Sequence, residues 1–173
     1  MGYKTIGVKP VSGALGAEIE GVDLSKDLSN ETFDDIHQAF LDHVVIFFRD
    51  QHITHEQHKA FGRRFGTLNI HPYVKGMDGH PEIMQIVKEP EDRINFGGGW
   101  HSDMSFLEEP ALGSILYARE VPPYGGDTLW ANQYLAYEAL SGGMKKMLEG
   151  LKAVHTAKGE YSERGASAQK RSS

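Results

Sequence analysis

A histidine and an aspartate one residue apart, His101 and Asp103, are the residues of this chain best placed to do chemistry. On an extended backbone, side chains at positions i and i+2 point to the same face. An imidazole nitrogen and a carboxylate oxygen are two members of the two-histidine, one-carboxylate triad that holds non-haem Fe(II) and leaves positions open for other ligands. Short motifs also arise by chance, so a surface strand in which the two side chains hydrogen-bond is the alternative.

The elements that must position this motif are short strands and a few helices. Alternating or short continuous apolar runs predict strands at residues 6–8, 15–19, 44–48, 83–87, 114–118 and 128–130. Helical spacing behind capping side chains predicts helices at residues 30–41, 54–65, 132–140 and 144–151. Many short strands with glycine-rich turns favour a mainly β fold, a sandwich or barrel, with flanking helices.

Composition limits the classes of function. The 173 residues carry a formal charge of −6 without a basic stripe, which disfavours binding to nucleic acid. The longest apolar run covers residues 44–48, far short of the roughly 20 that a membrane helix needs. The first residues contain no apolar stretch of signal-peptide length, so we expect a cytoplasmic protein that does not enter membranes. The sequence has no cysteine, which excludes thiolate metal sites and a cysteine nucleophile.

The residues around the motif carry a further signal. The segments that carry it are 16–19, 21–24, 45–51, 65–66, 70–72, 100–106, 113–114, 122–123, 125–130 and 136–141. In order and spacing they strongly resemble the taurine dioxygenase family, and the resemblance covers nearly the whole chain up to its polar tail. It implies a double-stranded β-helix, the cupin-like jelly roll, with helices along one side. Residues 1–158 would be the N-terminal portion of a single dioxygenase domain, and residues 159–173 a polar mobile loop or tail.

The resemblance also implies the reaction. Fe(II) would be bound by His101, Asp103 and a distal histidine, and 2-oxoglutarate would chelate the iron. Thr128 would hydrogen-bond the far carboxylate of 2-oxoglutarate, together with an arginine from the C-terminal half of the family. O₂ would convert 2-oxoglutarate to succinate and CO₂ and hydroxylate a small organic acid. Without the resemblance, Thr128 reads as a turn residue. His155 follows a predicted helix and aligns with a non-ligand histidine of the family, so it is expected not to bind iron.

Substrate-contacting residues transfer from the family less completely. His71 matches the histidine that contacts a sulfonate, with an ordinary surface-loop histidine as the alternative. Gly97 stands where the family has a pocket asparagine, and Val74 where it has a tyrosine. The remaining substrate-binding candidates are Tyr73, Asn95, Met104, Phe106 and Tyr161. These departures leave sulfonates, sulfate esters or another small acid as substrates.

Two other classes stay open. One is a truncated, inactive jelly-roll binding module, and the other is a cupin-like protein with another metal. The distal histidine and the arginine lie beyond the end of this sequence in the family, and half a jelly roll exposes unpaired strand edges. We therefore expect the whole protein to be longer, and to form a homodimer or homotetramer as family members commonly do.

Overall fold

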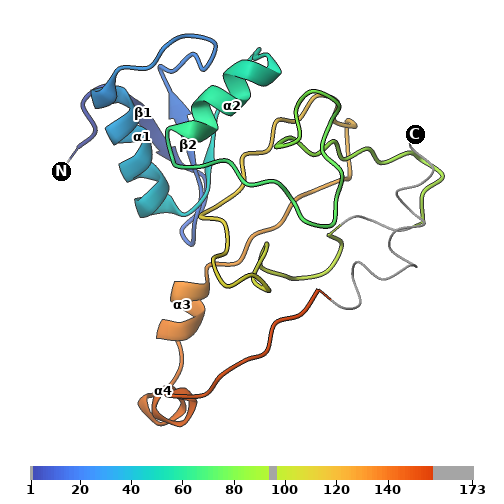
Figure 1. Cartoon of the computed structure of the whole chain (residues 1–173). Coiled ribbons are helices and arrows are strands. Elements are labelled where there is room, and N and C mark those ends of the chain that lie inside the picture. Colours follow the sequence, from blue (N-terminus) through green and yellow to red (C-terminus); the bar gives the residue numbers. More distant parts are fainter. Residues whose placement is uncertain (1, 94–96, 158–173) are drawn as a thin grey trace. The chain divides into compact units, whose positions relative to one another are not determined.

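The structure is a computed structural model that describes residues 2–93 and 97–157. Within these residues the chain forms a three-stranded sheet, four helices and long irregular segments (Figure 1). The chain divides into two units. The first, which we call the sheet unit, comprises Met1–Thr67 and Tyr117–Leu151, and the second, the motif unit, comprises Leu68–Leu116 and Lys152–Ser173.

The sheet unit is built on three short strands, which are β1 (Gly7–Pro10), β2 (Ala17–Glu20) and β3 (Ile46–Phe47). The strand order is β1-β2-β3, with β1 antiparallel and β3 parallel to the central β2. Ala17 and Ile19 on one face of β2 are 0% and 5% exposed. Glu18 lies on the other face, and its carboxylate is 2.6 Å from the guanidinium of Arg49. The alternation of buried and polar residues predicted for this segment is confirmed.

Two capped helices cover the sheet. In α1 (Asn30–His43) the hydroxyl of Ser29 accepts a backbone N–H of the first turn. In α2 (His55–Arg63) the side chain of Thr54 accepts the N–H of Gln57, and the side chain of Gln57 accepts the N–H of Thr54. These reciprocal bonds satisfy amides that have no partner inside the helix. Both helices were predicted from these signals, and both are confirmed.

The core of the sheet unit lies between these helices and the sheet (Figure 1). Ile36 of α1 is fully buried at its centre. The ring of Phe65 meets those of Phe33 and Phe61 edge to face, with centroids 4.9 and 5.4 Å apart. Such aromatic pairs add stabilisation beyond the burial of their area. The apolar spacing of α1 in the sequence predicted Phe33 and Ile36 on its buried face correctly, whereas Leu41, which belongs to the same pattern, is exposed.

The second segment of the sheet unit is fixed to the first by side chains. The hydroxyl of Tyr117 donates to the carbonyl of Gln51 at 3.1 Å and accepts the N–H of Ile53 at 3.4 Å. The ring of Trp130 meets that of Phe47 edge to face at 5.6 Å. These contacts return residues 117–130 to the sheet, although they form no strand there.

Two short helices follow, α3 (Gln133–Glu138) and α4 (Gly142–Leu148), capped by Asn132 and Ser141. The prediction that the last helix covers residues 144–151 was wrong at both ends. The hydroxyl of Ser141 accepts a backbone N–H of the first turn, so the helix begins earlier than the glycine pair suggested.

Several predicted strands are wrong. Residues 83–87, 114–118 and 128–130 are irregular, and only Ile46–Phe47 of the run 44–48 is a strand. A strand exists only with a hydrogen-bonded neighbour, and within the described part of the chain the first three segments have none. Val44 has a left-handed φ of 67°, which an extended strand cannot contain, so the predicted strand 44–48 is shorter in the structure. The described residues therefore form a small mixed sheet with helices, and the double-stranded β-helix stays a prediction.

Two further expectations are not decided by the fold. The polar tail, residues 159–173, lies outside the described residues, and the single-domain assignment of residues 1–158 stays a prediction. Across residues 2–93 and 97–157, every helix is too short or too polar to pass through a bilayer.

Replacing Ile36 by alanine should lower the free energy of unfolding by about 2–5 kcal/mol, because it leaves a cavity in a filled core. Leu41→Ala, in the same helix but 56% exposed, is the matched control and should cost far less. Urea unfolding of the two variants measures both values. Equal losses would show that α1 does not bury the face assigned to it.

Candidate metal centre

The chain turns directly after Asp103. His101 lies in irregular chain, and residues 103–106 form a turn in which the N–H of Leu107 donates to the carbonyl of Met104 at 3.0 Å. Met104 has a left-handed φ of 55°, which is uncommon and costly for a residue with a side chain. Backbone in such conformations is concentrated at functional sites.

The two side chains of the motif converge. The Nε2 atom of His101 lies 3.1 Å from Oδ1 of Asp103. Two ligands at right angles on one metal ion, each roughly 2.1 Å from it, are about 3.0 Å apart. The side chains are 42% and 60% exposed, which leaves the pair open to an incoming ion. The separation therefore suits two neighbouring ligands of a single metal ion.

The contact of the other ring nitrogen of His101, Nδ1, indicates where the protons of this pair lie. Its Nδ1 lies 2.7 Å from the carbonyl oxygen of Gly99. A carbonyl only accepts, so Nδ1 must carry a proton and donate it. In the neutral ring Nε2 then has a lone pair, which faces a carboxylate oxygen that is also an acceptor. Two acceptors at this distance need a positive charge between them, supplied either by a second proton on the ring or by a metal ion.

The carboxylate is held in the same way. The hydroxyl of Ser114 donates to Oδ2 of Asp103 at 2.9 Å, so Oδ1 remains directed at His101. Metal-binding histidines and carboxylates characteristically hold their outer atoms by such hydrogen bonds, which fix the tautomer and the ring orientation. The pair therefore fits a divalent metal ion. Its facing atoms, Nε2 and Oδ1, suit two metal ligands, and its outer atoms, Nδ1 and Oδ2, are held by hydrogen bonds.

A third protein ligand is not found among the residues that the structure describes, since no group of three histidine, cysteine, aspartate or glutamate side chains there could hold a metal. His155 belongs to no such group. Its Nδ1 lies 2.9 Å from the hydroxyl of Ser105, which makes it a partner of the turn after the motif.

Two backbone N–H groups fix the tautomer of the neutral His71 ring. Its Nδ1 accepts the backbone N–H groups of Tyr73 and Val74 at 3.1 and 3.0 Å, so in the neutral ring the proton is on Nε2. Burial lowers the pKa of His71 below its ordinary value, and the opposing charge of Asp103 raises it. Desolvation is the larger influence, which favours the neutral ring. A neutral histidine with a fixed Nε2–H group is suited to bind an anionic oxygen.

Aromatic rings extend from this histidine. The ring of Tyr73 meets that of His71 edge to face at 6.3 Å, and lies 5.8 Å from that of Phe106. Tyr73 is 56% exposed, whereas its neighbour Val74 is buried. Three of the substrate-binding candidates are thus grouped in the motif unit, in the same unit as the metal pair.

Of the other candidates, Met104 is half-buried in the turn that also contains Phe106. Thr128 is exposed on irregular chain of the sheet unit, so its expected role stays a prediction. Asn95 and Tyr161 lie outside the described residues.

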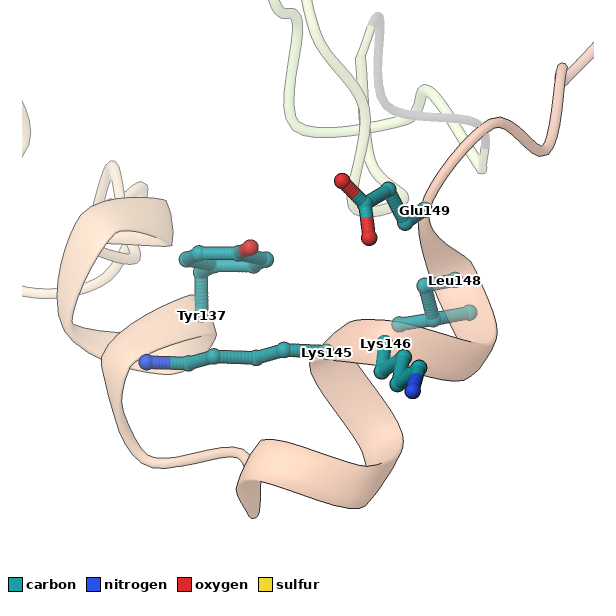
Figure 2. Close-up of a pocket in the computed structure, with 5 residues that line it drawn as sticks. All are labelled: Tyr137, Lys145, Lys146, Leu148 and Glu149. Carbon is teal, nitrogen blue, oxygen red and sulfur yellow. The ribbon is translucent and has the colours of Figure 1, made fainter.

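A hollow of about 430 Å³ in the sheet unit contains none of the predicted site residues; it is lined by Tyr137, Lys145, Lys146, Leu148 and Glu149 (Figure 2). The ammonium of Lys145 lies 4.9 Å from the centre of the Tyr137 ring and 2.7 Å from the carboxylate of Glu138. The charge of Lys145 is therefore already balanced by Glu138.

Two partners of the metal pair were missed by the sequence analysis. Ser114 was recognised only as part of a family motif, and the carbonyl of Gly99 has no signature in a sequence. Both contacts depend on the path of irregular chain, which residue spacing does not specify.

Comparison with known proteins now identifies the class. Residues 7–173 match the taurine catabolism dioxygenase TauD, TfdA family. The chain belongs to this family. A taurine dioxygenase structure from Burkholderia xenovorans is 42% identical, with a TM-score of 0.73 over 85% of this chain and 52% of that one.

Two further proteins, one curated and one of known structure, are also similar to this chain. The alpha-ketoglutarate-dependent sulfate ester dioxygenase of Pseudomonas putida is 38% identical over 89% of this chain and 50% of its own length. The structure of AAD-2 in complex with Mn(II) and N-oxalylglycine is 32% identical, with a TM-score of 0.65 over 84% of this chain and 50% of that one. The chain thus spans about half the length of the relatives it matches.

Ser114→Ala should weaken Mn(II) binding by the intact protein about 10–100-fold, because the outer oxygen of Asp103 loses its donor. Ser102→Ala is the matched control. It removes a hydroxyl from within the motif but contributes no atom to the pair, so affinity should stay near the wild-type value. Calorimetric titration with Mn(II) measures both. Wild-type affinity in Ser114→Ala would contradict the assigned role of Ser114.

Proposed function

We propose that the protein is an Fe(II)- and 2-oxoglutarate-dependent dioxygenase that hydroxylates a small organic sulfonate or sulfate ester. The observation that carries this proposal is the facing pair of acceptors, Nε2 of His101 and Oδ1 of Asp103, 3.1 Å apart. Membership of the TauD, TfdA family supports the choice of iron and 2-oxoglutarate over another metal. N-oxalylglycine, bound with Mn(II) in the AAD-2 structure, has the carbon skeleton of 2-oxoglutarate with an NH in place of one CH₂.

Iron and 2-oxoglutarate supply the oxidation when bound: O₂ and 2-oxoglutarate become succinate and CO₂, and the second oxygen atom enters a C–H bond of the substrate as a hydroxyl. His101 and Asp103 would hold the metal ion, and their side chains are kept in place by hydrogen bonds to the carbonyl of Gly99 and the hydroxyl of Ser114. We assign the third ligand to a distal histidine in the rest of the whole protein, as the family resemblance implies.

Thr128 is proposed to hold the far carboxylate of 2-oxoglutarate through its hydroxyl. The support is its position in the segment 125–130, which follows the family pattern, together with its exposure. Proteins position such carboxylates with a few well-placed donors, and we expect an arginine elsewhere in the protein to complete the set.

The acidic head of the substrate is assigned to His71. A sulfonate or a sulfate ester stays negatively charged at neutral pH, and the Nε2–H group of the neutral ring donates to one of its oxygens. Tyr73, Phe106 and Met104 supply apolar surface for the carbon chain. Asn95 and Tyr161 are proposed to complete the pocket on the strength of their places in the sequence.

The whole protein is proposed to form a double-stranded β-helix. The support is the match to taurine dioxygenase structures at 42% identity, in which this chain covers 52% of its relative. In such a fold, residues 83–87, 114–118 and 128–130 would pair with strands from the rest of the protein. A homodimer or homotetramer in the cytoplasm completes the proposal.

His101→Ala and Asp103→Ala should each abolish iron binding and succinate formation by the intact protein, since removing a ligand costs more than the roughly 10–100-fold loss of an outer partner. His52→Ala and Asp78→Ala are controls at exposed positions outside the site. Succinate is measured from 2-oxoglutarate in the presence of a sulfonate, and iron by elemental analysis.

Unchanged succinate and iron in both ligand variants would show that the site is elsewhere. A wild-type protein that binds iron but forms no succinate with any acid would be a binding module. The same assay tests the substrate class: sulfonates or sulfate esters should accelerate 2-oxoglutarate consumption, and acceleration by sulfur-free acids alone would refute it.

A further inference from the structure

The turn after Asp103 is held from a distant part of the chain. Ser105 directly follows the left-handed Met104 and is a central residue of the turn that the N–H of Leu107 closes. The Ser105 hydroxyl lies 2.9 Å from Nδ1 of His155, fifty positions further along the chain. A hydroxyl both donates and accepts, so this hydrogen bond can form with either tautomer of the neutral ring.

His155 reaches this turn from the chain that follows α4. This helix ends at Leu148, and Gly150 after it has a left-handed φ of 80°. From Lys152 onward the chain belongs to the motif unit, whereas α3 and α4 belong to the sheet unit. The segments that carry Ser105 and His155 are both irregular, and the side-chain hydrogen bond joins them within one unit.

The turn needs such support because its backbone conformation is costly. A left-handed residue with a side chain, such as Met104, persists only when the surrounding structure fixes it. The net free energy of one hydrogen bond is of the same order as the cost of one left-handed residue. A contact at the next residue, Ser105, can therefore decide whether Met104 keeps this conformation.

The conformation of Met104 matters for the metal pair because Asp103 directly precedes it. Oδ1 of Asp103 must stay close to its 3.1 Å separation from Nε2 of His101 if both atoms are to bind one ion. The hydroxyl of Ser114 holds the carboxylate of Asp103, whereas the backbone below it continues into the turn. Metal ligands must be held to within about 0.5 Å, so a relaxed turn would disturb the pair.

We propose that His155 is a positioning residue of the metal centre. It binds no metal; its hydrogen bond to Ser105 fixes the turn, and the turn directs Asp103 towards His101. This inference rests on the proposed function, because the site that His155 positions is the proposed metal centre. It adds a residue that lies far from the motif in sequence and acts only through the turn.

Calorimetric titration of the intact, folded protein with Mn(II) tests this role. His155→Leu removes the hydrogen bond and should weaken Mn(II) binding about 3–10-fold, the ratio to which the net free energy of one hydrogen bond corresponds. Asparagine, like leucine and histidine, branches at Cγ, but it offers a polar atom at the position of Nδ1. His155→Asn should therefore stay within about twofold of the wild-type affinity. His52→Leu, the same change at an exposed position of the sheet unit, is the matched control and should not alter the affinity.

Ser105→Ala completes a double-mutant cycle. It should weaken Mn(II) binding as much as His155→Leu does, and the double variant should lose no more than either single variant, because both changes break one bond. Additive losses would overturn the inference, as would a loss in His155→Asn equal to that in His155→Leu. If His155→Leu does not fold, the milder Ser105→Ala decides the case, and wild-type affinity there would overturn the role of His155.

Urea unfolding of the metal-free variants separates positioning from simple stabilisation. A contact that only stabilised the fold would lower the urea midpoint and leave the Mn(II) affinity of the folded protein unchanged, which would overturn the inference. Coupled losses of affinity in a protein that forms no succinate would support this inference and contradict the proposed function. Unchanged affinities in a protein that forms succinate would do the reverse. A wild type that binds no Mn(II) would overturn both.

Discussion

Two hydrogen-bond acceptors, Nε2 of His101 and Oδ1 of Asp103, face each other at 3.1 Å while a carbonyl fixes the only proton of the neutral ring on the opposite nitrogen. The arrangement is stable only with a positive charge between the two atoms. A second ring proton would make an exposed ion pair, which contributes about 0–1 kcal/mol. A divalent ion would satisfy both atoms at once, and the outer hydrogen bonds are those that metal ligands use. The proposed chemistry depends on this constraint.

The surrounding chain is shaped to maintain the pair. Met104 turns the backbone immediately after the aspartate in a conformation that non-glycine residues seldom adopt. Gly99 supplies the carbonyl for the ring, and Gly97 approaches the ring where a side chain would collide with it. A conformationally costly position, Met104, thus lies next to the motif, as expected where local geometry serves function.

Sequence reasoning succeeded where the signals are local. The side chains of Ser29 and Thr54 cap helices by contacting residues within one turn, so α1 and α2 could be predicted. The side chains of His101 and Asp103 converge as their spacing predicts, although the chain there is irregular and not a strand. In the irregular segments it failed, because residues 83–87 and 114–118 form strands only if partners pair with them.

Residue spacing also could not predict the hydrogen-bond partners of His101 and Asp103. Ser114 reaches Asp103 across eleven positions of irregular chain, and the carbonyl of Gly99 reaches His101 from the same irregular chain. Thr128 belongs to the sheet unit, whereas the metal pair belongs to the motif unit. A family pattern can nominate such residues, but only coordinates show which atoms meet.

The most direct test of the central claim is the position of a metal ion in crystals of the intact protein grown with Mn(II). The account predicts one anomalous difference peak about 2.0–2.3 Å from both His101 Nε2 and Asp103 Oδ1, with Gly99 and Ser114 still bound to the outer atoms. A peak at other residues, or none together with a direct hydrogen bond between the two side chains, would contradict it.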